Sequence, residues 1–285
     1  MTSTVSLTTG TPFAAEEPPG PHRRLLMCSA DYFRIDYEIN PYMHVGVQPD
    51  LDAAVAEHDG IIAAHLAAGR KVEFVDADPG CPDMTYTANA AVVRGDRAVL
   101  ATLPPERAAE TPHHRAWLEN NGFDVADTRY AFSGQGDALA CGDLLLTAHG
   151  QRTDVRAHRT LERHLGYELV SLRTTSPRWY DLDLAVAVVH PGHALAYNPE
   201  ALDAPSLRTL RGLGLDLIEV ASEEAANFAL NLISDGRTVT MTSGAPRLAA
   251  DLKALGLTVV ELDTTELRKG GGGVRCTALT LDHPA

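Results

Sequence analysis

One unit recurs along this chain and restricts its fold more than any other feature. Turn residues such as Arg94-Gly95-Asp96 join two short apolar strands into a hairpin, and an amphipathic helix and a further strand follow. Hairpins that alternate with helices predict an α/β protein with mixed sheets. Repeated units that each bury one face favour a closed, roughly circular array.

The hairpins and helices of this unit have clear sequence signals. Asp50 is a good N-cap for the first helix, which should end at Gly69. We expect hairpins at 91–100, 184–197 and 228–241, helices at 50–69, 105–120, 154–165, 206–213 and 246–255, and a last strand at 278–281.

The chain organisation is simple. No Pro- or Gly-rich linker divides the middle of the 285 residues, so we expect a single catalytic-type domain over 23–285. Residues 1–22 are rich in Thr, Ser, Pro and Glu, a composition that predicts a flexible tail. The tail has no basic start and no apolar core, so it is not expected to be a signal peptide.

The formal net charge of −14 restricts the partners. Nucleic acid and anionic membrane surfaces repel such a chain, whereas a small cationic substrate is compatible with it. No apolar run is long enough to cross a bilayer, and four widely spaced cysteines favour free thiols in the cytoplasm. We expect no cofactor and no metal, because phosphate loops, GxGxxG and CxxC motifs are absent. The sequence is also compatible with a homo-oligomer.

Cys276 is the candidate nucleophile. It follows the run Gly270-Gly-Gly-Gly-Val-Arg, and glycines would leave room for a substrate beside the sulfur. The alternative is a buried structural cysteine at the start of a strand.

Three other segments carry polar residues that could bind or act on a substrate. Asp83 and Asn89 bracket an aromatic residue before a strand, and Ser133 precedes a glycine turn. Asp181 and Asp183 would lie on the same side of a strand, where two carboxylates repel each other unless a cation or proton lies between them. Taken one at a time, each segment also fits an ordinary turn or a solvated strand face.

Together these segments resemble the guanidino-group-modifying members of the pentein superfamily, which are dimethylarginine dimethylaminohydrolases, arginine deiminases, arginine dihydrolases and amidinotransferases. The resemblance covers almost the whole chain from Leu25 to Leu281, and the segment Thr87-Ala-Asn89-Ala is most similar to the arginine dihydrolases. It implies a five-bladed α/β propeller with pseudo-fivefold symmetry and an active site on its axis. It also implies a cysteine thiolate that attacks the guanidinium carbon of a small cationic amino acid, while a histidine moves the protons.

Residue by residue, the resemblance makes Cys276 the nucleophile and Asp183 a guanidinium ligand. Asn89 falls where many members have a guanidinium-binding aspartate, and Asp83 matches an earlier aspartate of that segment. Arg152 and Arg107 match arginines that can bind a substrate carboxylate.

Two positions depart from the family pattern. Asp181 stands where the catalytic histidine is expected, and Ser133 stands where its acidic partner is expected. An ordinary aspartate is a weak base and a poor proton donor at neutral pH, so Asp181 would need a strongly raised pKa to replace the histidine. His149, His190 or His193 would be other sources of an imidazole.

Three functions are compatible with these departures. The first is a hydrolase or amidinotransferase-like enzyme that acts on arginine or a relative through Cys276 with non-standard acid/base groups. The second is a degenerate member that binds an arginine-like ligand without turnover. The third is a biosynthetic enzyme with a changed reaction on the same fold.

Overall fold

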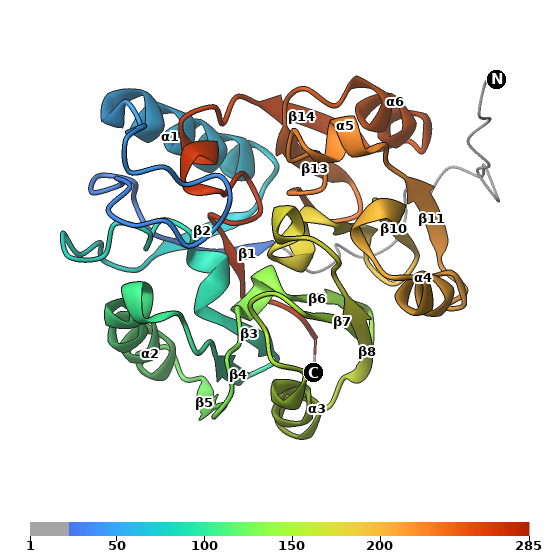
Figure 1. Cartoon of the computed structure of the whole chain (residues 1–285), viewed down its shortest axis with the longest axis horizontal. Coiled ribbons are helices and arrows are strands. Elements are labelled where there is room, and N and C mark those ends of the chain that lie inside the picture. Colours follow the sequence, from blue (N-terminus) through green and yellow to red (C-terminus); the bar gives the residue numbers. More distant parts are fainter. Residues whose placement is uncertain (1–22, 285) are drawn as a thin grey trace.

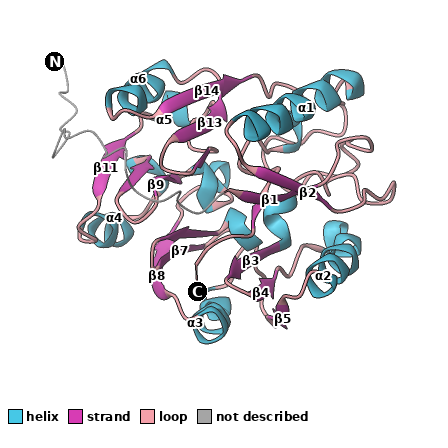
Figure 2. Cartoon of the chain, turned by 180° about the vertical axis from the view of Figure 1, so that it is seen from behind, coloured by secondary structure: helices cyan, strands magenta, loops and turns pink. Residues whose placement is uncertain are grey.

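The computed structural model describes residues 23–284, so the expected tail at 1–22 lies outside the described residues. Five three-stranded sheets surround a common centre and the helices cover the outside, which gives the five-bladed α/β propeller (Figure 1). The same arrangement is seen from behind, with helices at the periphery and strands inside (Figure 2). Among the helices of residues 23–284, none combines the length and hydropathy that a membrane crossing requires.

Four blades share one local topology. In each, two strands form an antiparallel hairpin, and a helical crossover brings a third strand parallel to the second. Their strands are β3 (Ala91–Arg94), β4 (Arg97–Leu100), β5 (Asp124–Asp127), β6 (Ala138–Cys141), β7 (Leu144–His149), β8 (Glu168–Arg173), β9 (Val186–His190), β10 (Ala194–Tyr197), β11 (Asp216–Glu219), β12 (Ile233–Ser234), β13 (Thr238–Thr242) and β14 (Thr258–Leu262).

The remaining blade closes the ring with both ends of the described chain. β1 (Arg24–Met27) pairs parallel with β2 (Lys71–Phe74) and antiparallel with β15 (Leu279–Thr280). Cys276 lies just before β15, so ring closure holds the segment that carries it.

The helices follow the expected positions, with 3-10 turns at some ends. The Asp50 carboxylate accepts a hydrogen bond from the Ala53 amide and begins the first helix, as expected of an N-cap. The predicted helix at 105–120 is a 3-10 turn to Glu110 followed by an α-helix. The helices are α1 (Leu51–Ala67), α2 (Thr111–Asn120), α3 (His158–Leu165), α4 (Ala204–Arg211), α5 (Ser222–Ala225) and α6 (Pro246–Ala254).

Two expectations about strands are wrong. The segment 228–232 is not a strand, because Phe228 adopts a φ of 63° and the pairing begins only at Ile233. Asp181 and Asp183 do not share a strand face, because residues Leu182–Leu184 form a 3-10 turn and β9 begins at Val186.

Candidate active site

The carboxylate of Asp181 is the centre of a buried polar network. The Ser133 hydroxyl donates a hydrogen bond of 2.7 Å to Oδ1, and the Asn89 amide donates one of 3.1 Å to Oδ2. The Arg152 guanidinium approaches Oδ2 to 3.2 Å and lies over the ring of Tyr180, 4.1 Å from its centroid. The loops of different blades therefore bring four of the predicted site residues into direct contact.

Gly136 makes this contact possible. A Cβ atom at this position would lie 2.6 Å from both the Asn89 amide nitrogen and Asp181 Oδ2. Carbon atoms do not approach polar atoms so closely, so only glycine lets the turn after Ser133 pass beside the network.

Cys276 and Asp183 form a second buried group. The thiol Sγ donates to Asp183 Oδ2 at 3.4 Å, and the Asn231 side-chain amide donates to Sγ at 3.0 Å. Asn231 also accepts hydrogen bonds from the backbone amides of Arg275 at 2.9 Å and Cys276 at 3.2 Å. Asn231 therefore fixes both the sulfur and the backbone that carries it.

The glycine run before Cys276 does not provide the open space that we expected from the sequence. A Cβ at Gly272 would lie 2.3 Å from the Tyr86 ring, and one at Gly271 would lie 2.6 Å from Asn40. Side chains fill this volume, and Cys276 is only 4% exposed. The glycines allow close packing around the nucleophile instead.

Burial and repulsion raise the pKa values of this group. Burial raises the pKa of Asp183 well above its usual range, and the negative charge of Asp181 adds to the shift. Burial, and then the charge of Asp183, raise the pKa of the Cys276 thiol. Asp137 shows the same effect, because burial and the Asp181 charge raise its pKa to about 8. The carboxyl that carries a raised pKa next to the nucleophile is thus Asp183.

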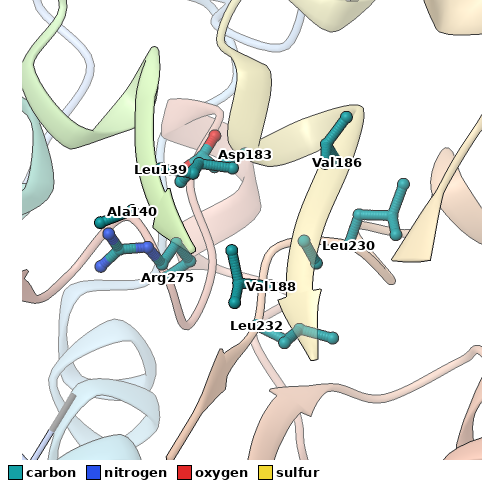
Figure 3. Close-up of a pocket in the computed structure, with 9 residues that line it drawn as sticks. Leu139, Ala140, Asp183, Val186, Val188, Leu230, Leu232 and Arg275 are labelled. Carbon is teal, nitrogen blue, oxygen red and sulfur yellow. The ribbon is translucent and has the colours of Figure 1, made fainter. Parts of the chain in front are cut away.

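Asp183 also has an oxygen without a partner. Its Oδ1 atom is buried and makes no hydrogen bond among the described residues, although the residue is only 1% exposed. A small cavity of about 10 Å³ lies beside it, and its wall is apolar apart from Asp183 and Arg275 (Figure 3). Such surroundings disfavour an unpaired carboxylate and favour either a proton or a cation on it.

A larger hollow of about 310 Å³ opens next to the first network. Its polar wall is formed by Ser133 and Arg152. The rest of the wall is more apolar and contains Ile39, Thr102, Leu103, Pro104, Pro105, Ala131 and Phe132. Its volume is that of a site for a small molecule.

Arg107 and Asp83 lie behind Asn89. The Arg107 guanidinium forms a bidentate pair with Glu110 at 2.8 Å and donates to Asn89 Oδ1 at 2.9 Å and to the Asp83 carbonyl at 3.1 Å. Arg107 is 3% exposed, and its bonds hold neighbouring residues in place. Burial raises the pKa of Asp83 to about 6.

The histidines that we considered as replacements lie against other groups. His149 packs edge-on against His158 and His190 against His193, at ring-centroid distances of 5.9 and 4.8 Å. The side chains that bond to the Cys276 sulfur are instead those of Asn231 and Asp183.

Sequence reasoning missed Asn231. Asn231 interrupts the apolar run Ala229-Leu230-Asn231-Leu232-Ile233, and it is fully buried. A single polar residue inside such a run is a signal of a required hydrogen bond, and it would have identified Asn231.

Several known proteins are similar to this chain in sequence and in fold. A family model described as N,N dimethylarginine dimethylhydrolase, eukaryotic, matches residues 42–281. The N(G),N(G)-dimethylarginine dimethylaminohydrolase of Mycobacterium tuberculosis is 39% identical, over 92% of this chain and 86% of that protein. The bifunctional arginine dihydrolase/ornithine cyclodeaminase AgrE of Nostoc sp. is 34% identical over 92% of this chain, which spans 38% of that longer protein. The product-bound N-terminal domain of ArgZ, a cyanobacterial arginine dihydrolase, has a TM-score of 0.86 and 33% identity, with 92% of this chain and 98% of that chain covered.

Proposed function

Because this chain belongs to the dimethylarginine dimethylaminohydrolase family, we propose that it hydrolyses a guanidino C–N bond of arginine or a close relative, with Cys276 as the nucleophile. The contact between Cys276 Sγ and Asp183 Oδ2, with Asp183 Oδ1 left without a partner, is the observation that carries this proposal. A guanidinium group would supply N–H donors to this unpartnered oxygen and would add a positive charge beside the carboxyl group.

The first half of the reaction begins when the positively charged substrate binds beside Asp183. A bound guanidinium favours the ionised form of Asp183, whose proton leaves to solvent. Asp183 then accepts the thiol proton across the 3.4 Å contact while Sγ forms a bond to the guanidinium carbon. Asp183 returns that proton to one nitrogen, the C–N bond breaks, and ammonia or a methylamine leaves. A cationic S-amidino adduct remains on Cys276.

Water completes the reaction. The Asp183 carboxylate accepts a proton from the water molecule as its oxygen bonds to the adduct carbon. The C–S bond then breaks, the hydroxyl proton passes to the sulfur, and the free thiol and a ureido product result. The proton left on Asp183 is finally taken up by the released amine, so one water is consumed and one ammonium or methylammonium ion forms. Once the cationic group has gone, Asp183 takes back from solvent the proton that it lost when the substrate bound.

Asp181 and Ser133 stand where the family resemblance predicts the histidine and its acidic partner, and we assign them a different role. The charge of Asp181 raises the pKa of Asp183, and Ser133 and Asn89 hold the Asp181 carboxylate in place. In this proposal Asp181 is a positioning residue and Asp183 moves the protons.

Arg152 is the proposed ligand of a substrate carboxylate. Its side chain is 17% exposed, and the residue forms part of the wall of the 310 Å³ hollow. Arg107 is instead proposed to support Asn89 and Asp83 from behind, since its donors are engaged there. The substrate class is therefore a small cationic amino acid; a homo-oligomer and a cytoplasmic location remain predictions.

Purified protein incubated with arginine and with its N-methylated forms tests the proposal. We expect ammonia or methylamine and a ureido amino acid, detected by mass spectrometry, and no product from Cys276→Ser. Cys141→Ala is the matched control, because Cys141 is buried in β6 away from the described contacts of Cys276. Arginine binding without any product would overturn hydrolysis and favour a ligand-binding protein, and absence of binding would favour a changed reaction.

A further inference from the structure

A second cluster of chemically reactive side chains lies outside the candidate active site. Asp78, Cys81 and His113 each offer one donor atom, and these oxygen, sulfur and nitrogen atoms all lie within 4.8 Å of one another. The first two residues come from the loop after β2, and the third comes from α2, so the cluster joins two separate elements.

The loop holds its two donors in a fixed turn. The Cys81 amide donates to the Asp78 carbonyl at 2.9 Å, which places both side chains on one turn. The Gly80 amide donates to Asp78 Oδ1 at 2.7 Å. This bond leaves the other carboxylate oxygen, Oδ2, directed to His113.

His113 completes the cluster from the first turn of α2. Its Nε2 atom lies 3.7 Å from Asp78 Oδ2, and the side chains of His113 and Asp78 are 37% and 42% exposed. Both side chains can therefore rotate toward a shared ligand. Cys81 is 6% exposed, so its sulfur forms the inner side of the cluster.

We propose that Asp78, Cys81 and His113 bind a borderline-soft divalent cation, with Zn²⁺ as the best match and water as the fourth ligand. Thiolate, imidazole and carboxylate are the three side-chain ligands that Zn²⁺ takes in proteins. Bond lengths of about 2.0–2.3 Å place tetrahedral donors about 3.5 Å apart, so only small rotations of the two exposed side chains are needed. The thiol proton is released to solvent when the Zn–S bond forms.

The cation would link the loop to α2 close to Asp83 and Arg107, which lie behind Asn89. Asp83 follows Cys81 by two residues, and its carbonyl accepts from Arg107, which precedes α2. A metal that binds only the folded protein raises its melting temperature by mass action. The role of the site is thus structural, and the hydrolytic steps proposed above do not pass through it.

Co²⁺ titration of the full chain tests the site, because a Co²⁺–thiolate bond gives a near-ultraviolet charge-transfer band. The titration uses protein that carries Cys276→Ser, so that the active-site thiol cannot hold the metal. We expect one Co²⁺ per chain at micromolar concentrations, a thiolate band, and displacement by Zn²⁺ with a higher melting temperature.

Matched variants in the same background separate this site from other thiols. Cys81→Ser should abolish the thiolate band, and His113→Ala, at a half-buried position, should weaken Co²⁺ binding at least about tenfold. Cys141→Ala should leave both unchanged. A thiolate band that survives Cys81→Ser, Co²⁺ affinity that is unaffected by His113→Ala, or no binding at all would overturn the proposal.

Discussion

The Ser133 hydroxyl donates a hydrogen bond of 2.7 Å to Asp181 Oδ1, across 48 residues of sequence. These are the two positions at which the family resemblance predicts a catalytic histidine and its acidic partner. The two side chains are in direct contact, so we treat them as one unit in the prediction that follows. A serine is a suitable neighbour for a buried carboxylate, because it donates a hydrogen bond and adds no charge.

A variant with the histidine and the acid that the family resemblance predicts at positions 181 and 133 tests whether Asp181 and Ser133 act together. We expect the double variant Asp181→His/Ser133→Glu to raise guanidine hydrolysis by about 10²-fold, because an oriented imidazole can both accept and donate protons near neutral pH. Steady-state ammonia release from arginine gives the comparison with the parent protein.

The single variants are the control for this prediction. Ser133→Glu alone places a second carboxylate beside buried Asp181 and should destabilise the fold by about 3–5 kcal/mol. Asp181→His alone lacks the acid that orients the imidazole. Additive effects of the two changes, in place of strong coupling, would show that they do not act as a unit.

The Cys276 thiol should ionise only at alkaline pH in the free protein. Burial and Asp183 raise its pKa, so the thiolate fraction grows as the pH rises through that raised value. We expect iodoacetamide to alkylate Cys276 slowly at neutral pH, with a rate constant that still increases above pH ~9. The modified peptide is quantified by mass spectrometry.

The variant Asp183→Asn tests whether Asp183 raises the pKa of the Cys276 thiol. Removal of a negative charge beside the sulfur favours the thiolate, so the alkylation profile should move to lower pH. The same variant should lose hydrolysis, because an amide cannot accept the thiol proton. A profile that stays in place would contradict the role of Asp183 in the thiol pKa.

Much of the fold could be predicted from local signals. Asp50 caps its helix as expected, and the turn Arg94-Gly95-Asp96 joins the expected hairpin, because both depend on neighbouring residues. The site was less predictable. The contacts of Asp181 with Ser133 and Asn89 depend on how loops from different blades meet, and no local pattern determines that arrangement.

Long-range packing also explains the errors at the site. The glycines before Cys276 were expected to leave open space, but side chains from distant segments such as Tyr86 fill it. The cluster of Asp78, Cys81 and His113 could not be recognised from the sequence, because Cys81 and His113 are far apart along the chain and only the packing of α2 on the loop after β2 brings them together.

The contribution of Asp137 to stability should fall as the pH rises from about 5 to 8. Asp137 has a folded-state pKa of about 8, above its ordinary value of 3.8, so between these values the folded state binds more protons than the unfolded state. The stability contributed by this group is present at low pH and is lost as the pH approaches 8, by up to about 1.4 kcal/mol per pH unit. Asp137→Asn should flatten the melting temperature against pH over this window. An equally steep dependence in the variant would refute the assignment.

Asn231 should position the nucleophile. Asn231→Ala removes the bonds to Sγ and to the amides of Arg275 and Cys276, so we expect kcat to fall about 10- to 100-fold with little change in KM. The alkylation profile of Cys276 should change as well, which loss of packing alone would not cause. Asn227→Ala, at an exposed site of the same segment, is the control for replacement of an asparagine there. Equal effects of both variants on kcat would argue against positioning.

Arg152 should select substrates that carry a carboxylate. Agmatine has the guanidinium of arginine without the carboxylate, so the ratio of kcat/KM for arginine to that for agmatine isolates this contact. We expect Arg152→Gln to reduce this ratio by about 10²-fold, because a charge-assisted bidentate hydrogen bond is lost. Part of the loss will be common to both substrates, since Arg152 also contacts Asp181 at 3.2 Å. A ratio that does not change in Arg152→Gln would show that another group binds the carboxylate and that Arg152 serves the Asp181 network alone.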